Sequence, residues 1–99
     1  MYLIDITIKA DKVPADLSEK LLAGHRKWFT GQAQAGKFLL VGPYKDKEMA
    51  GLAIAYTNSR AELDEIIAHD AYYPDYATYD VHEFQANLIA DNLPDFQGK

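Results

Sequence analysis

The feature that most constrains the fold is the order in which strand-like and helix-like apolar patterns follow each other. Four short segments have the apolar pattern of strands, and two longer ones have apolar residues at helical spacing. The predicted strands are Tyr2–Lys9, Lys37–Val41, Gly51–Thr57 and Thr78–Leu88, and the predicted helices are residues 16–35 and Arg60–His69. This β-α-β-β-α-β order predicts an α+β, ferredoxin-like fold, in which a four-stranded antiparallel sheet carries both helices on one face.

Local signals support several of the predicted boundaries. Ser59 with Glu62 forms a capping box that opens the second helix, and Gly36 ends the first. The alternation of the fourth strand changes phase near Glu83, which predicts a β-bulge there. We expect one domain over residues 1–88 and a C-terminal tail over residues 89–99, which extends along a surface or a partner chain.

Composition excludes several classes of partner. The net charge is −5, and ten basic residues are interspersed with fifteen acids, which disfavours a nucleic-acid surface. No apolar run reaches the length of a membrane span, and the N-terminus does not have the pattern of a signal peptide. With no cysteine in the chain, we expect a cytoplasmic protein without thiol chemistry or membrane partner.

The predicted strands are partly apolar on both faces, which is more than one layer of helices can cover. Leu3, Leu39 and Val41 are expected on one side, against Phe38, Leu40 and Ile54 on the other. A second copy packed sheet to sheet would cover the remaining face. We therefore expect a homodimer in which two ferredoxin-like sheets pair into a dimeric α+β barrel.

Two titratable residues occupy positions that helical geometry turns toward the interior. His25 falls within the apolar arc of the first helix, which includes Leu21 and Trp28. In the second helix, Leu63 and Ile67 set an apolar stripe whose next position is Asp70. Burial of an unpaired ionisable group is costly, so the two side chains are expected to be partners across adjacent helices.

A histidine paired with a carboxylate can perform acid–base chemistry. The carboxylate accepts a hydrogen bond from one ring nitrogen, which fixes the tautomer and leaves the other nitrogen as a base near neutral pH. An alternative is that His25 is a satisfied core residue and Asp70 only shapes the following turn. A zinc site built from His25, Asp70 and His82 is a further alternative, although none of these residues has the spacing of a ligand pair.

The order of several short motifs resembles the YCII-related (YciI-like) family over about residues 2–88. The first half has His25-Arg26-Lys27-Trp28, then Gly36, an apolar strand and Gly42-Pro43. The second half has Gly51, another apolar strand, a serine-capped helix, Asp70 followed by aromatic residues, and a final strand with Phe84.

This resemblance implies a dimeric ferredoxin-like α+β barrel with a proposed catalytic pair at His25 and Asp70. It also implies that Gly42 and Pro43 border the pocket. The family usually follows its aspartate with proline, whereas this chain has Ala71-Tyr72. We expect Trp28 or Tyr72 to contact a small-molecule ligand, because an aromatic ring can stack on it and a phenol can donate to it.

The resulting expectation is a small enzyme that removes or delivers a proton at an aromatic or enol-like molecule, in an elimination or isomerisation. No cofactor or resident metal is expected. One alternative is a non-catalytic dimeric module that binds a ligand or regulates another protein. A cofactor-free monooxygenase of the dimeric α+β barrel type is a further alternative, which rests on fold analogy alone.

Overall fold

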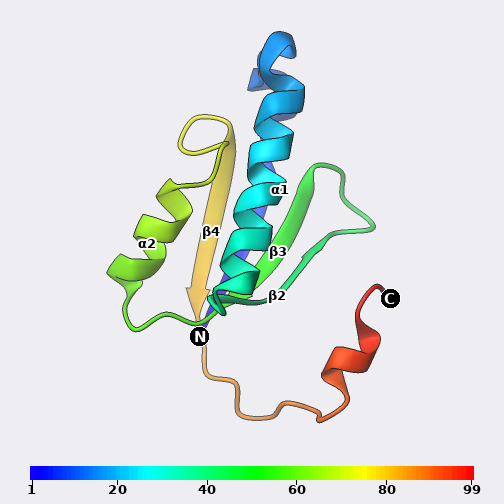
Figure 1. Ribbon diagram of the computed structural model, residues 1–99, viewed down its shortest axis with the longest axis vertical. Coiled ribbons are helices and arrows are strands. Elements are labelled where there is room, and N and C mark those ends of the chain that lie inside the picture. The colour runs from blue at the N-terminus through cyan, green and yellow to red at the C-terminus, as the bar shows by residue number, and fades with distance from the viewer.

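The computed structural model describes all 99 residues and contains four strands and two α-helices (Figure 1). The strands are β1 (Tyr2–Ile8), β2 (Phe38–Pro43), β3 (Ala50–Ala55) and β4 (Ala77–Glu83), and the helices are α1 (Ser18–Gln34) and α2 (Arg60–Ala68). Short 3₁₀ turns precede α1 and lie in the C-terminal tail. None of the helices is both long and apolar enough to cross a lipid bilayer.

The strands form one antiparallel sheet in the order β2-β3-β1-β4, with both helices in front of it (Figure 1). The predicted α+β ferredoxin-like fold is therefore confirmed. The Ser59 hydroxyl accepts a hydrogen bond from the Glu62 N–H at 3.1 Å, so the predicted cap opens α2. Gly36 has a φ of +76°, a conformation that favours glycine and ends α1.

The core lies between the sheet and the two helices. Ile4 and Ile6 of β1 are at most 2 % exposed, and Leu63 of α2 is fully buried. Ala53 and Ala55 of β3 face the same way and are also fully buried. Their small side chains leave room for the large aromatic residues of α1 and β2, so this face of the sheet holds its helices closely.

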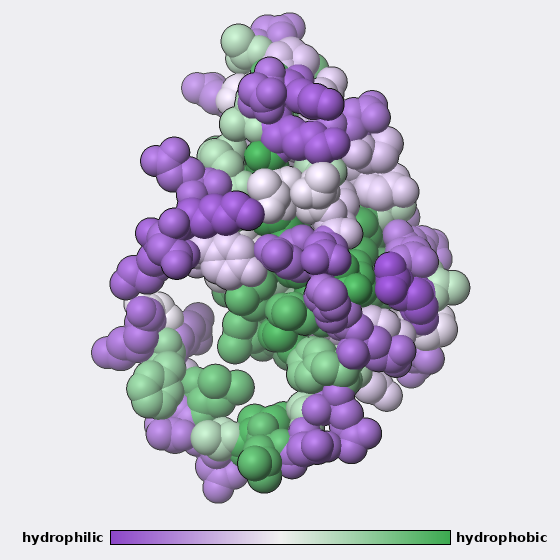
Figure 2. Space-filling model, turned by 180° about the vertical axis from the view of Figure 1, so that it is seen from behind, coloured by the Kyte–Doolittle hydropathy of each residue, from purple (hydrophilic) through white to green (hydrophobic).

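The other face of the sheet is not covered by any element of the chain (Figure 2). Because directly paired residues on antiparallel strands share a face, the register places Leu3, Leu40, Leu52 and Ile54 together on it. Figure 2 shows apolar surface in this region. We refer to these four residues as the open-face patch.

Two strand predictions require correction. The fourth strand ends at Glu83 and pairs with β1 in unbroken register, so the predicted bulge near Glu83 is wrong. The change of phase in the sequence arises because the pairing with β1 ends at Phe84, and the residues after it form no strand. The prediction that Phe38, Leu40 and Ile54 share a face opposite Leu3 is also wrong. Leu39 interrupts the pairing of β2 with β3, so Leu40 and Ile54 lie with Leu3 on the open face, and Phe38 lies on the other face.

The C-terminal tail leaves the domain after Phe84, whose backbone pairs with Met1. No hydrogen bond joins residues 85–99 to the rest of the chain. The tail curves away below the sheet and returns beside β2 (Figure 1), which leaves a hollow of about 790 Å³ between the two. Leu88 and Phe96 of the tail are 95 % and 58 % exposed.

Candidate functional site

The imidazole of His25 and the carboxylate of Asp70 form a hydrogen bond in the core. The Nδ1 atom of His25 lies 2.7 Å from Oδ1 of Asp70, and the two side chains are 8 % and 0 % exposed. His25 comes from the middle of α1, and Asp70 lies two residues beyond the end of α2. The two groups are therefore neighbours in space although 45 residues separate them in the sequence.

Aromatic side chains enclose the His25 ring. Its centroid lies 4.4 Å from that of Phe29, 4.9 Å from that of Tyr72 and 5.7 Å from that of Trp28. These contacts restrict rotation of the imidazole, so Nδ1 remains directed at Asp70.

The second ring nitrogen of His25 has no partner in the protein. The ring makes a side-chain hydrogen bond through Nδ1 alone, and no fully enclosed side-chain nitrogen or oxygen in the chain lacks a partner. Nε2 therefore retains contact with solvent. An ionised carboxylate can only accept, so Nδ1 must carry the proton that joins it to Asp70. In the neutral ring, Nε2 then carries the lone pair that accepts a proton from outside.

Asp70 accepts a second hydrogen bond, from the hydroxyl of Tyr79 to Oδ2. Tyr79 lies on β4 opposite Ile6, on the face of the sheet that carries the helices. Burial is the main cause that raises the pKa of Tyr79 above its ordinary value, and the bond to Asp70 raises it further. Each oxygen of the buried carboxylate thus has its own donor.

A close contact between backbone segments makes the His25–Asp70 distance possible. Gly24 precedes His25 and Ala71 follows Asp70, and a Cβ atom added to Gly24 would lie 2.9 Å from the Cβ of Ala71. Since real Cβ atoms are not found that close together, only glycine fits at position 24 without a shift. The small residue after Asp70 serves the same contact, because a larger side chain would push α1 away.

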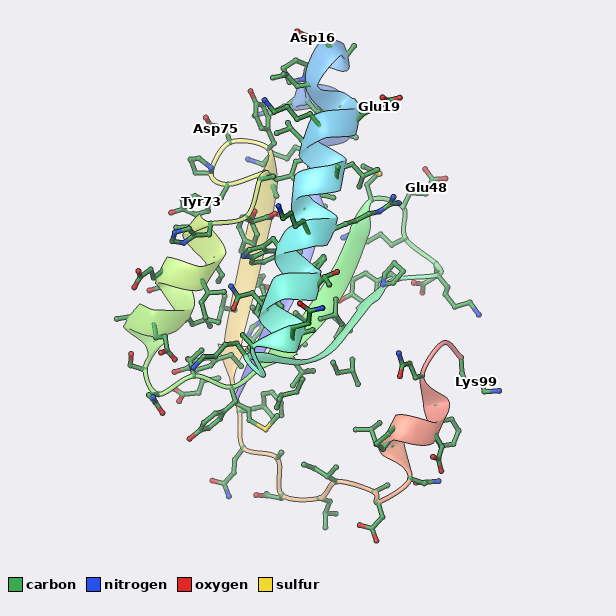
Figure 3. All side chains as sticks on the ribbon, in the orientation of Figure 1. Asp16, Glu19, Glu48, Tyr73, Asp75 and Lys99 are labelled. Atoms are coloured by element: carbon green, nitrogen blue, oxygen red, sulfur yellow. The ribbon has the colours of Figure 1, made fainter.

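A cavity of about 430 Å³ lies on one side of His25. This volume is within the range that holds small-molecule ligands. Its wall is largely apolar and includes Ile6, Ile8, Leu22, Phe29 and Met49, with the polar residues Arg26, Tyr44, Lys47 and Glu48. In Figure 3, Glu48 lies on one side of α1 and Tyr73, which follows the Asp70 turn, lies on the other. The cavity and the turn therefore flank α1.

The larger hollow beneath the tail has two lysines, Lys45 and Lys99, as its only ionisable side chains. Its lining contains no histidine, aspartate, glutamate or tyrosine. The candidate site is therefore the smaller cavity, which contains His25.

The sequence model of the YCII-related domain matches residues 1–85. The chain belongs to the YCII-related domain family. A comparison with curated proteins finds no match to the sequence.

In this YCII-related domain, the predicted site residues separate into two groups. His25, Gly42 and Pro43 line the same cavity. Trp28 and Tyr72 lie in the core instead, since they are 7 % and 2 % exposed and do not reach the cavity wall. Trp28 donates its indole N–H to the Ile66 carbonyl at 2.8 Å, which ties α1 to α2.

The three residues of the alternative zinc site do not come together. His82 is exposed, lies opposite Leu3 of β1 on the open face of the sheet, and pairs with Asp80 at 3.3 Å. No group of three or more histidine, aspartate or glutamate side chains is arranged to hold a metal ion.

Sequence reasoning did not identify Tyr79 as a partner of Asp70, although a signal was present. Tyr79 and Val81 share the inward parity of β4. A tyrosine on a buried face usually finds a partner for its hydroxyl. Asp70 was the carboxylate predicted to face the same interior.

Alanine at position 24 tests the close contact between α1 and the Asp70 turn. In an open helix, glycine to alanine adds roughly 0.5–1 kcal/mol of stability. We expect this gain for Gly31→Ala, because the added Cβ atom would have no neighbour within 4 Å. We expect Gly24→Ala to be less stable than Gly31→Ala by about 1 kcal/mol or more, because its Cβ atom would collide with Ala71. Urea unfolding of both variants measures the difference, and equal gains would contradict the contact.

Alkaline pH is expected to destabilise the domain. Burial raises the pKa of Tyr79 and of Tyr72, and the charge of Asp70 raises both further. The pKa of each tyrosine in the folded state exceeds its unfolded value near 10. The contribution of both residues to the free energy of unfolding is therefore complete below pH 10 and decreases above it. The slope is at most about 1.4 kcal/mol per pH unit for each tyrosine, and smaller where solvent reaches the ring. Unfolding measured from about pH 8 to 12 should show a plateau and then a fall, and Tyr79→Phe should reduce the slope. A flat profile would contradict this.

Proposed function

We propose that this YCII-related domain is an acid–base enzyme in which His25 transfers a proton to or from a small molecule. Asp70 holds the Nδ1–H tautomer and stabilises the imidazolium that forms when Nε2 takes up a proton. The observation that carries the proposal is the buried His25–Asp70 hydrogen bond, which leaves Nε2 without a protein partner on a residue that lines a ligand-sized cavity.

The largely apolar wall of the cavity favours a small aromatic or enol-like substrate. The reaction class is abstraction of a proton from carbon followed by elimination or isomerisation, since this chemistry needs only a placed base in an enclosed site. In this proposal the substrate binds in the cavity against Phe29, Gly42 and Pro43, with its acidic C–H directed at Nε2 of His25.

Deuterium exchange tests the proposal before the substrate is identified. A panel of small enolisable ketones and unsaturated lactones is incubated with the protein in D₂O, and incorporation is followed by NMR. We expect exchange with at least one compound and its loss after diethylpyrocarbonate acylates His25, with the modified site mapped by mass spectrometry. Exchange that persists after modification of His25 would overturn the mechanism. No exchange across the panel would favour a non-catalytic ligand-binding module.

We also propose that two copies pair through the open face of the sheet. The open-face patch leaves Leu3, Leu40, Leu52 and Ile54 uncovered by their own chain.

A lysine placed in the open-face patch tests this pairing. We expect a dimer by light scattering at micromolar concentration, and expect Ile54→Lys to convert it to a monomer because the buried charge would be unpaired. Ala61→Lys, at an exposed position of α2, is the matched control and should leave the dimer intact. A monomer by light scattering of the unsubstituted chain would contradict the proposed pairing.

A further inference from the structure

The Asp70 carboxylate is shared between two donors that come from different layers of the fold. His25 Nδ1 approaches Oδ1 from α1, and the Tyr79 hydroxyl approaches Oδ2 from β4 in the sheet. The Asp70 side chain is 0 % exposed, so water does not compete for these oxygens. The state of one donor must therefore influence the bond to the other.

Tyr79 is well placed to remain a donor. Its ring packs near that of Tyr73, with centroids 5.9 Å apart, and its raised pKa keeps the hydroxyl protonated through neutral pH. A phenol that donates to a carboxylate takes up part of its negative charge. The charge that Asp70 presents to the imidazole is reduced accordingly.

We propose that Tyr79 is a positioning residue that fixes the orientation of Asp70 and limits how strongly Asp70 holds a proton on His25. The inference rests on the proposed function, because it assigns Tyr79 to the same proton-transfer site. While the Tyr79 hydroxyl donates to Oδ2, the Asp70 carboxylate cannot rotate away from His25 without losing its hydrogen bond to Tyr79. Proton release from Nε2 is also easier than it would be beside a carboxylate with a single donor.

Few other ionisable groups act on this cluster. On α1, the charge of Arg26 opposes the effect of Asp70 on the pKa of Tyr72. In the turn after α2, Tyr72 and Tyr73 both act on Tyr79. The β2–β3 loop brings Lys47 and Glu48 to the cavity. β1 contributes Ile4 and Ile6, which carry no charge, so Tyr79 is the group of the sheet in direct contact with the carboxylate.

The experiment is an NMR titration of the His25 ring in the full chain and in Tyr79→Phe. Removal of the hydroxyl leaves Asp70 with one donor, so the imidazolium should persist to higher pH. We expect the midpoint of the His25 titration to rise by about 0.5–1 pH unit, the size that one hydrogen bond of ordinary strength gives. Tyr73→Phe is the matched control, because the Tyr73 ring lies beside that of Tyr79 and its hydroxyl makes no hydrogen bond to Asp70; the backbone bond from the Tyr73 N–H to the Asp70 carbonyl is unchanged by the substitution. It should leave the midpoint unchanged.

A second variant keeps the test decisive if Tyr79→Phe does not fold. Replacement of Tyr79 by 3-fluorotyrosine keeps the ring and makes the hydroxyl a stronger donor, so the midpoint should fall. A merely structural tyrosine would change the unfolding free energy and leave the His25 titration in place, which would overturn the inference. The titration requires no substrate. A shift of the His25 midpoint without any deuterium exchange would therefore contradict the proposed enzymatic activity and still support the role of Tyr79.

Discussion

Replacement of Asp70 by alanine is expected to lower the free energy of unfolding by about 3–5 kcal/mol. This is the usual cost when one member of a buried, hydrogen-bonded pair is removed. Both His25 Nδ1 and the Tyr79 hydroxyl lose their acceptor, and the Asp70 side chain they enclosed was completely buried. For a domain of 99 residues, such a loss is a large fraction of the total stability.

Urea unfolding with Asp64→Ala as control measures this effect. Asp64 pairs with Arg60 at 2.8 Å on the surface of α2, with side chains 59 % and 54 % exposed. An exposed pair of this kind contributes at most about 0.5 kcal/mol. Asp70→Asn keeps the volume and one acceptor, and should fall between the two variants. A loss below about 1 kcal/mol for Asp70→Ala would show that the buried pair does not stabilise the fold.

Replacement of His25 by glutamine is expected to reduce catalysed deuterium exchange by a factor of about 10²–10⁴. This is the range that a positioned general base usually contributes. Glutamine retains an N–H that can donate to Asp70, but it has no nitrogen that takes up a proton near neutral pH. It also fills much of the space between Phe29 and Tyr72, so the fold is less disturbed than by alanine.

The control for this variant is His82→Gln. His82 is an exposed histidine on β4 that lies outside the cavity, so its replacement should leave exchange unchanged. Circular dichroism of both variants establishes that they are folded. Loss of less than about threefold in His25→Gln would exclude His25 as the base.

The inward positions of His25 and Asp70 could be predicted because each lies on an apolar stripe of helical spacing. The capping box at Ser59 and the alternation of β1 likewise depend on neighbours in the sequence. These features require only local geometry. The topology then follows from the order of the elements, which brings the two helices together on one face of the sheet.

The parts of the site that escaped prediction depend on contacts between distant segments. The Tyr79–Asp70 bond requires the register of β4 against β1, and the Gly24–Ala71 contact requires the distance between α1 and the Asp70 turn. Trp28 and Tyr72 were predicted to contact a ligand because they are aromatic, and the structure places both in the core beside His25. Their positions depend on the packing of α1 against α2, which helical periodicity alone does not specify.

The most direct test of the account is the protonation state of the His25 ring, measured by long-range ¹H–¹⁵N NMR correlation across the pH range in which the chain is folded. We predict that the neutral ring carries its proton on Nδ1, bonded to Asp70, and that Nε2 is the nitrogen that gains a proton as the pH falls. A neutral ring with its proton on Nε2, or a ring that does not titrate until the chain unfolds, would contradict it.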